Sequence, residues 1–331
     1  MTLPSVSSEI LYQKLQSLPE KPGVYIFLDS EGMVLYVGKS INLKKRVMGY
    51  FRNNKNDHKK IQILGKNIHD IELHITRTEL EALILEDSMI KNYLPEYNTR
   101  QKEFKEYYYL SITDDTFPAI ILHQNPENSD YERSFGPYKN VHFAACVKNL
   151  ICDTFGIRYC TKKAPIDMCI RGELGQCSAP CRNNITEKEY DKIIIRTLEF
   201  LNGKKKEILR IVQQKIKQYS SELQFEKAAE WRDQVKFIIG FCLRQKFSHK
   251  FFHKILVIEE GSKPQRTYFF IRGELKKVLF TKPSQESIDK IILRMGKENK
   301  LHQKSIELLD RALVVYSWLQ RNKKDKDYYF I

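Results

Sequence analysis

The stretch GVYIFLDSEGMVLYVGKSINLKKR, residues 23–46, decides the fold of the N-terminal part of this chain. Its two apolar runs, Val24–Leu28 and Val34–Val37, each contain one tyrosine and flank the polar segment Asp29–Gly32. Apolar runs on either side of a short segment that ends in glycine are typical of a β-hairpin. We therefore expect two antiparallel strands that place both tyrosines in one small region.

The residues that follow the hairpin predict a basic helix. Gly38 is expected to end the second strand, because glycine weakens strands. Ser40 is expected to cap a helix that carries Lys44, Lys45 and Arg46 on its first turns. Two phenols, a glycine and an arginine are thus brought together by local structure.

The whole chain has 331 residues, enough for two or three compact units. Lys and Arg outnumber Asp and Glu by 56 to 41, and the net charge of +15 favours an acidic polymer as partner, nucleic acid first. No apolar run approaches the roughly 18 residues of a membrane-spanning helix, and the N-terminus lacks the basic and apolar regions of a signal peptide. These features predict a soluble, cytoplasmic protein with no membrane partner.

Residues 39–66 contain nine Lys or Arg and a single acid, Asp57. One interpretation is the solvated, charged face of a helix. The other is a track for a phosphate backbone, because clustered cations release counterions when they bind a nucleic acid.

A third strand is expected at Ile71–Thr76, followed by a helix from Thr78 to about Tyr93 that ends before Pro95. Glu86 falls on the apolar face of this helix, where a carboxylate is costly unless a partner compensates. The partner is either one of the many cations or a bound metal ion.

Four of the seven cysteines fall within 22 positions: Cys160, Cys169, Cys177 and Cys181. Their segment is broken by glycine and proline and predicts a closed four-ligand site, with free thiols as the alternative. Their intervals match neither a paired CxxC zinc ribbon nor a ferredoxin run. The other three lie in apolar, helical surroundings and are expected in the core: Cys146, Cys152 and Cys242.

The remaining segments predict a mixed structure. Residues 98–140 are expected to be extended, with a strand near Ala119–Leu122 and a turn at Phe135–Tyr138. Residues 187–247 are expected to be helical with one break near Ser220–Gln224, which makes two antiparallel helices that are either internal or a docking site for a partner. Further elements are expected as strands at 254–258, 267–271 and 278–280 and a closing helix at 305–320.

Taken together, these stretches resemble a known family. The N-terminal part resembles the GIY-YIG nuclease module, written here as Gly23-Val24-Tyr25 and Tyr36-Val37-Gly38. The first 240 or so residues are similar to the N-terminal half of the UvrC family, through the ordered motifs GVY, YVGK, NLKKR, LILED, PEYN, FGPY, four cysteines and FEKAAEWRDQV. About 85 residues follow the helical hairpin region that ends near residue 247, too few for a second nuclease and paired helix-hairpin-helix units, so the chain is similar to a short, Cho-like form.

The resemblance implies an α+β fold with a three-stranded antiparallel sheet in the nuclease domain. The implied domains are a lead-in helix at 1–20, the GIY-YIG nuclease at 21–100, a linker and cysteine-rich region at 101–186, a helical region with a UVR-like hairpin at 187–247, and a small α+β segment at 248–331.

The resemblance also implies the site. Its catalytic residues would be Tyr36, Arg46, Tyr25, Lys39, Tyr50 and Asn98. Tyr36 would act as the general base and Arg46 would face the phosphate, while Glu86 would hold one Mg²⁺ or Mn²⁺ ion. The four clustered cysteines would bind a [4Fe-4S] cluster, with zinc as the alternative.

The implied function is a metal-dependent, structure-specific DNA endonuclease. It would cut one strand near a lesion, on the 3′ side, in UvrABC-type nucleotide excision repair. The implied partners are damaged double-stranded DNA and UvrB, the latter through residues 211–239, with no small-molecule substrate. The alternatives are a nuclease of a mobile-element, restriction or replication-associated system, and a non-catalytic module that binds DNA or UvrB.

Overall fold

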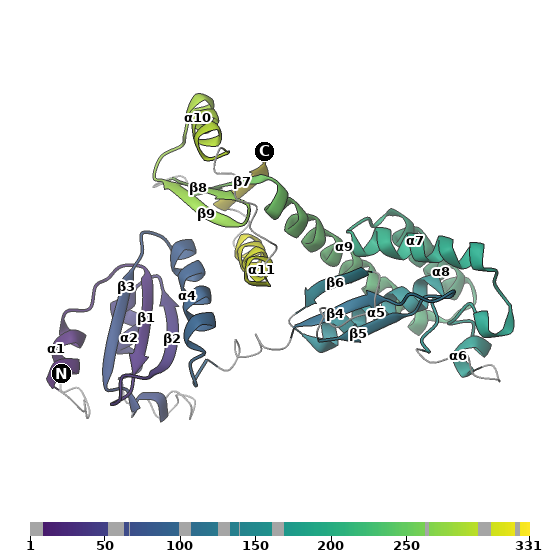
Figure 1. Cartoon of the computed structure of the whole chain (residues 1–331), viewed down its shortest axis with the longest axis horizontal. Helices are drawn as coiled ribbons and strands as arrows, with labels where there is room; N and C mark the ends of the chain where they lie inside the picture. Colours follow the sequence, from purple (N-terminus) through teal and green to yellow (C-terminus); the bar gives the residue numbers. More distant parts are fainter. Residues whose placement is uncertain are drawn as a thin grey trace. The chain divides into compact units, whose positions relative to one another are not determined.

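The computed structural model of the chain describes residues 9–51, 63–65, 67–98, 107–124, 133–138, 140–160, 169–261, 265–296, 306–321 and 325–331. The chain divides into two compact units, Met1–Lys105 and Glu106–Ile331 (Figure 1).

The first unit is built on a three-stranded antiparallel sheet with the strand order β2-β1-β3. Its strands are β1 (Gly23–Leu28), β2 (Val34–Ser40) and β3 (Asp70–Ile75), and its helices include α1 (Glu9–Gln16), α2 (Leu43–Met48) and α4 (Glu79–Tyr93). Every residue of the central strand β1 is buried. The predicted hairpin and third strand are confirmed.

The two faces of this sheet have different cores. Side chains alternate along a strand, so Tyr25 and Phe27 pack with residues of α1 and α2, whereas Val24 and Ile26 pack with residues of α4. The helix α4 begins as predicted, with the Thr78 side chain accepting a hydrogen bond from the N–H of Glu81. 

Two expectations for the hairpin are wrong. Gly38 does not end β2 but pairs with Tyr25 inside the sheet. A Cβ atom there would overlap the Tyr25 hydroxyl and lie 2.8 Å from Cε1 of Tyr36, so the glycine makes room for two phenol rings. The cap of α2 is Asn42, which accepts from the N–H of Lys45, because Ser40 still belongs to the strand.

The second unit begins with a sheet of strand order β5-β4-β6, covered by helix α5 (Val141–Phe155). Its strands are β4 (Tyr108–Ile112), β5 (Ile120–His123) and β6 (Arg133–Tyr138). The expected strand near residues 119–122 is confirmed as β5. The turn expected at Phe135–Tyr138 is wrong, because these residues pair with β4.

Helices follow this sheet: α6 (Ile170–Glu173), the short 3₁₀ helix η2 (Pro180–Arg182), α7 (Glu187–Leu201), α8 (Lys206–Ser221) and α9 (Phe225–His253). The helical hairpin of α8 and α9 is confirmed. The sequence did not predict the second break at residues 202–205, where Gly203 adopts a positive φ of 87°. Cys152 and Cys242 are buried as expected, whereas Cys146 is exposed, because it lines an open cavity between α5 and the α8–α9 hairpin.

The C-terminal part of the second unit is a four-stranded antiparallel sheet of order β10-β7-β8-β9. It comprises β7 (Ile255–Glu260), β8 (Arg266–Ile271), β9 (Glu274–Leu279), α10 (Gln285–Gly296), α11 (Ile306–Gln320) and β10 (Lys326–Phe330). Helix α10 and strand β10 were not expected. The α+β fold class is confirmed.

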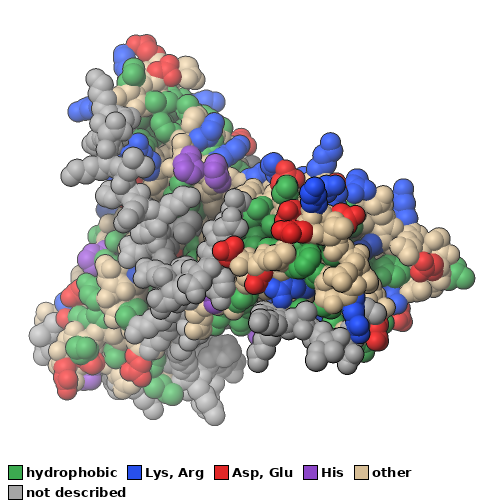
Figure 2. Space-filling view, turned by 45° about the vertical axis from the view of Figure 1, so that its right-hand side comes forward, with side chains coloured by type: hydrophobic (Ala, Val, Ile, Leu, Met, Phe, Trp, Pro, Cys, Tyr) green, Lys and Arg blue, Asp and Glu red, His purple; other side chains and the backbone are tan. Residues whose placement is uncertain are grey.

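The surface carries charges of both signs. Lys and Arg side chains are interspersed with Asp and Glu side chains on the face shown in Figure 2. Within the described residues, no helix is long and apolar enough to cross a membrane.

Candidate active site

The strongest polar cluster of the first unit consists of phenols and one guanidinium. The hydroxyls of Tyr25 and Tyr50 lie 2.8 Å apart, and Nε of Arg46 donates to the Tyr25 hydroxyl at 3.3 Å. A terminal nitrogen of Arg46 donates to the Tyr50 hydroxyl, also at 3.3 Å. The ring of Tyr36 lies 6.0 Å from that of Tyr25 and 6.2 Å from that of Tyr50. Strands β1 and β2 and the helix α2 therefore bring four of the predicted residues together.

Local structure explains why these side chains meet. Tyr25 and Gly38 are opposite each other in the β1–β2 register, and Phe27 is opposite Tyr36. Tyr50 follows Arg46 by four residues, which places the two side chains on the same side of α2 and its C-terminal turn. The Arg46 guanidinium lies 5.3 Å from the centroid of the Tyr50 ring, within the range of a cation–π contact.

The electrostatics of the cluster keep the phenols of Tyr25 and Tyr36 protonated and the guanidinium of Arg46 charged. Burial raises the pKa of Tyr25 well above its usual value, and the phenols of Tyr50 and Tyr36 add to this rise. Burial also raises the pKa of Tyr36, while Arg46 acts in the opposite direction. Burial opposes the charge of Arg46, but the neighbouring phenols raise the pKa of this guanidinium overall.

The outer edge of β2 is covered by side chains from α4 and the turn that follows it. The Asn98 amide bonds both backbone groups of Val37: its Oδ1 accepts from the N–H at 2.9 Å and its Nδ2 donates to the C=O at 2.7 Å. One strand period further along, the N–H of Lys39 donates to Oε1 of Glu86 at 2.9 Å. Glu86 and Asn98 thus satisfy the backbone of an otherwise unpaired edge strand. 

The carboxylate of Glu86 is mostly buried and lies near positive groups, which suits it to bind a cation. Burial raises its pKa, while the N–H and ammonium of Lys39 and the charge of Arg46 lower it. In the described part of the chain, Glu86 has no ion-pair partner, so the salt bridge considered for it is not formed there. A single carboxylate fits Mg²⁺, which usually keeps several waters and takes one or two protein carboxylates. Among the described residues, no group of three or more His, Cys, Asp or Glu is placed to hold a metal ion, so a cation at Glu86 would have a single carboxylate from this part of the chain.

Lys39 is held by the same helix at two points. Besides its backbone bond to Glu86, its ammonium pairs with Glu79 at 2.9 Å. Glu79 is not among the residues that the sequence predicts for the site. Glu79 lies seven residues, or about two helical turns, before Glu86, and this spacing places both carboxylates on the same face of α4.

The four clustered cysteines lie in the second unit. All four are free thiols in the described structure. Burial raises the pKa of Cys177, and the thiols of Cys160, Cys169 and Cys181 raise it further, which requires that they are within electrostatic reach. The Sγ of Cys160 lies 4.0 Å from a guanidinium nitrogen of Arg158. The thiols gather, but not within the spacing of a formed metal site.

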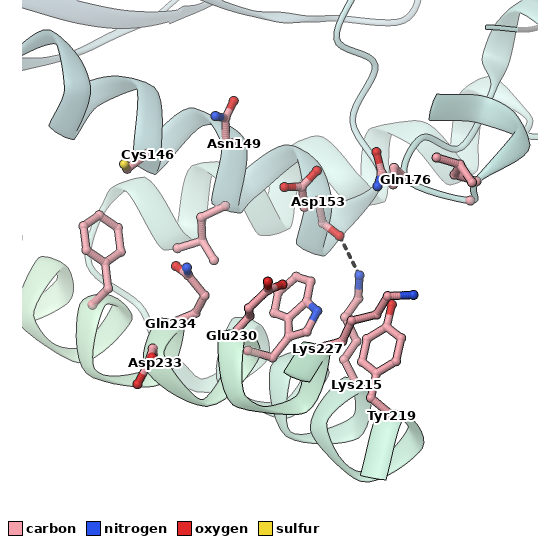
Figure 3. A pocket seen from close by; sticks show the side chains of 15 residues that line it. Cys146, Asn149, Asp153, Gln176, Lys215, Tyr219, Lys227, Glu230, Asp233 and Gln234 are labelled. Atoms are coloured by element: carbon pink, nitrogen blue, oxygen red, sulfur yellow. Dashed lines mark hydrogen bonds between the residues drawn. The ribbon is translucent and has the colours of Figure 1, made fainter. Parts of the chain in front are cut away.

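The hairpin of α8 and α9 forms one wall of a cavity of about 750 Å³, which also reaches α5 and the turn after α6 (Figure 3). Trp231 lies in this wall, and the Lys215 ammonium sits 4.4 Å from its ring centroid. The same ammonium donates to the C=O of Asp153 on α5. One face of the hairpin is therefore internal, while Leu223 and Phe225 at its tip are 74% and 64% exposed.

The predicted basic segment at residues 39–66 lies partly outside the described residues. Of its cations, Lys44 and Lys45 belong to α2, and Lys44 pairs with Glu20 at 3.2 Å.

Three family matches follow one another along the chain. Residues 21–99 match the family described as the UvrC-like GIY-YIG domain, residues 107–200 match the UvrC/Cho excinuclease middle domain, and residues 206–238 match the UvrB/uvrC motif.

Relatives agree with this order. The UvrABC system protein C of Thermoanaerobacter sp. (strain X514) is 38% identical over 240 residues, which are 71% of this chain and 39% of that protein. The protein of the same name from Clostridium acetobutylicum is 40% identical over 228 residues, 67% of this chain and 36% of that protein. The chain thus spans about two fifths of the length of the curated relatives it matches.

A solved structure is also similar. The GIY-YIG N-terminal endonuclease domain of UvrC from Thermotoga maritima, bound to magnesium as its catalytic divalent cation, is 35% identical. The match covers 28% of this chain and 98% of that chain, with a TM-score of 0.25.

The sheet, its tyrosines and the matched segment place residues 21–99 in the class of GIY-YIG domains. With the middle domain and the UvrB/uvrC motif behind it in the same order, the chain is a UvrC-like protein.

Proposed function

We propose that this protein is a metal-dependent DNA endonuclease that cuts one strand near a lesion, on the 3′ side, in UvrABC-type nucleotide excision repair. The supporting observation is the cluster of Tyr25, Tyr50 and Arg46, joined by hydrogen bonds of 2.8 to 3.3 Å, beside a β2 edge that also carries Glu86. The proposed setting is the bacterial cytoplasm.

Arg46 is the proposed phosphate-binding group. A guanidinium keeps its charge and offers several donors in a fixed plane, which suits the nonbridging oxygens of a phosphodiester. The phenols of Tyr25 and Tyr50 hold two of its nitrogens, so the side chain is preorganised before DNA binds.

Tyr36 is the proposed general base, and Lys39 is a second cation at the same strand. In this structure, burial keeps the Tyr36 phenol protonated at neutral pH. Loss of its proton therefore requires added positive charge near the ring. While it keeps the proton, the Tyr36 phenol orients water or phosphate as a hydrogen-bond donor.

Glu86 is the proposed ligand of one Mg²⁺ or Mn²⁺ ion. When bound, such an ion supplies positive charge for the reacting phosphate and its departing oxygen. The chain's contribution is to hold the carboxylate on α4 against the Lys39 N–H, which fixes one of its oxygens.

The four clustered cysteines are the proposed ligands of a [4Fe-4S] cluster, with zinc as the alternative: Cys160, Cys169, Cys177 and Cys181. The placement of the other three thiols within electrostatic reach of Cys177 supports this assignment. Anaerobic purification followed by iron, sulfide and zinc analysis decides between the two metals.

A UvrB-type protein is the proposed partner of the α8–α9 hairpin. The match to the UvrB/uvrC motif and the exposed Leu223 and Phe225 support this contact. A pull-down that retains UvrB with the wild type and loses it with Leu223→Ser/Phe225→Ser agrees with the proposal. Equal retention by both proteins contradicts it.

The deciding experiment is incision mapping on a damaged duplex with Mg²⁺, with and without UvrA and UvrB. A single cut on the 3′ side of the lesion, dependent on UvrA and UvrB and lost in Arg46→Ala, is expected. Wild-type cutting by Arg46→Ala contradicts the proposed site. Cutting that ignores the lesion and needs neither partner favours a nuclease outside repair.

A further inference from the structure

The C-terminal half of α9 is unusual in its charge. Residues 234–258 contain no Asp or Glu, but five Lys or Arg and two His. The four lysines of this run are exposed: Lys236, Lys246, Lys250 and Lys254. In the described part of the chain, none of them pairs with a carboxylate. Cations elsewhere in the unit do, as in Arg210–Glu207 at 2.7 Å and Lys204–Glu199 at 2.8 Å.

These cations share one side of the helix. At 3.6 residues per turn, Lys236, Lys246, Lys250 and His253 fall within an arc of about 100°. We call these four residues the α9 track. It extends over 18 positions, or about 26 Å of helix, comparable with roughly eight phosphates of one DNA strand at about 3.4 Å each.

The other side of this helix is committed to the protein core. Ile238, Phe241 and Cys242 are buried in a core that also contains residues of β4, α5, α7 and α8. Farther along the helix, Phe247 and Phe251 are also buried. The track is therefore held on a rigid element that runs from the hairpin to the C-terminal sheet (Figure 1). 

An exposed glycine, Gly240, lies beside the track, between Lys236 and Lys246 along the helix. Gly240 lies on the exposed side, and a Cβ atom there would meet nothing within 4 Å. A glycine inside a helix costs about 1 kcal/mol relative to alanine, so folding alone does not favour it at this position. Its lack of a side chain lets a backbone approach α9 closely.

We infer that the α9 track binds the phosphate backbone of duplex DNA, as a contact surface separate from the nuclease cluster. The inference extends the proposed action on DNA, but concerns binding alone. A rigid row of lysines with no acid among them fits a linear polyanion, which releases counterions when it is neutralised. An anionic membrane fits less well, since insertion needs several apolar side chains on the same face. Among the apolar side chains of α9 from residue 234 onward, Leu243 alone is exposed, at 47%, and the aromatic ones are buried or half-buried.

Binding of the full chain to a fluorescent 30-bp duplex, measured by anisotropy in EDTA, tests this inference. The variant Lys236→Gln/Lys246→Gln/Lys250→Gln removes three charges from the track. A control, Lys188→Gln/Lys192→Gln/Lys217→Gln, removes three exposed charges from α7 and α8. We expect the track variant to bind on the order of 10-fold more weakly and to lose about 2 to 3 from the slope of log K against log salt. The control is expected to stay within about twofold of the wild type.

A gain of binding complements this loss. Gly240→Lys adds a cation in open space and a better helix former, so misfolding does not account for its effect. It is expected to tighten binding and raise the salt slope by about 1.

Several outcomes overturn the inference. One is equal weakening of DNA binding in the track and control variants, and another is no change in either. A third is a track variant that loses binding to phosphatidylglycerol vesicles while its DNA affinity stays unchanged, since this would assign the surface to a membrane. Arg46→Ala separates the two proposals. An inactive Arg46→Ala protein that binds the duplex normally leaves the α9 track standing, and a track variant that binds the duplex as tightly as the wild type overturns the track alone.

Discussion

Two strands invite comparison, β1 in the first unit and β8 in the second. Both are inner strands of antiparallel sheets, and both carry a fully buried tyrosine, Tyr25 and Tyr268. Tyr25 lies between Gly38 and Leu73, and its hydroxyl contacts a second phenol and a guanidinium. 

Tyr268 has different neighbours. It lies between Ile258 and Val278, and its hydroxyl donates to Glu260 at 2.6 Å. Its ring meets the edge of Trp318. A buried tyrosine on an inner strand can therefore belong either to a candidate active site or to a hydrophobic core. The glycine on the neighbouring strand and the direct hydrogen bond from a guanidinium distinguish the site, since at Tyr268 the guanidinium of Arg266 bonds Glu260 and not the phenol.

The largest expected effect separates the two carboxylates beside these strands. Glu86→Gln is expected to lower the incision rate on the order of 10²- to 10³-fold, because it removes the charge that receives the metal ion. Glu260→Gln, in β7, is expected to leave the rate within about twofold, since Glu260 serves the core. Single-turnover cleavage of a damaged duplex measures both. An equal loss of incision rate in Glu86→Gln and Glu260→Gln would contradict the proposal that only the first carboxylate belongs to the active site.

The next effect separates the two tyrosines. Tyr25→Phe is expected to lower incision on the order of 10-fold or more, because Arg46 loses the acceptor for its Nε–H. Tyr268→Phe is expected to cost about 1.5 kcal/mol of folding free energy through the lost bond to Glu260, with incision unchanged. Urea unfolding and cleavage assays are run on the same preparations. Unchanged cleavage by Tyr25→Phe would assign its hydroxyl to folding.

The third test concerns glycine. Gly38→Ala is expected to destabilise the chain by about 2 kcal/mol, because the new Cβ overlaps a ring that is buried on all sides. Gly240→Ala lies in open space on a helix and is expected to stabilise by about 0.5 to 1 kcal/mol. Urea unfolding of the full chain measures both changes. A Gly38→Ala variant as stable as the wild type would show that the packing around Tyr25 relaxes freely, and a destabilised Gly240→Ala would show that its position is not open.

The smallest effect is a shift in pH dependence. Burial raises the pKa of Glu86, and a protonated carboxylic acid binds no cation. Cleavage at limiting Mg²⁺ is therefore expected to fall as the pH drops through this raised pKa, at higher pH than for an ordinary glutamate. Higher Mg²⁺ competes with the proton and is expected to move this limb to lower pH. Rates at several pH values and two Mg²⁺ concentrations measure the shift, and an acid limb independent of Mg²⁺ contradicts it.

Much of the fold could be predicted where neighbours in sequence decide it. The turn at residues 29–32 forms because Asp29 accepts from two nearby N–H groups and Gly32 adopts a positive φ of 78°. Helix α4 follows its Thr78 N-cap and ends at Tyr93, with Leu94 as its C-cap before Pro95. The hairpin of α8 and α9 followed from its two apolar stripes. Helix α10 and strand β10 were missed, since a short edge strand such as β10 forms only through its partner β7.

The candidate site was predicted in part, namely where contacts between neighbours in sequence decide the local structure. Each predicted residue of the first unit lies in or beside the phenol cluster or on the β2 edge, but their roles remain proposals. The Lys39–Glu79 pair was missed, because it joins residues 40 positions apart. The expectation that Gly38 ends its strand failed, because the value of that glycine lies in the space left for Tyr25 on another strand.

The sequence by itself determined the hairpin, its two tyrosines, the basic helix after it and the spacing of the cysteines, because turns, caps and periodicity act over a few residues. Only the tertiary structure decided that Asn98 bonds Val37 across 61 residues and that Glu86 meets the N–H of Lys39 across 47. Those contacts depend on where α4 packs, and packing is set by the burial of side chains from many segments at once. The same physics turned the acid-free run at residues 234–258 into one exposed row, since buried aromatic residues fix which side of α9 faces water.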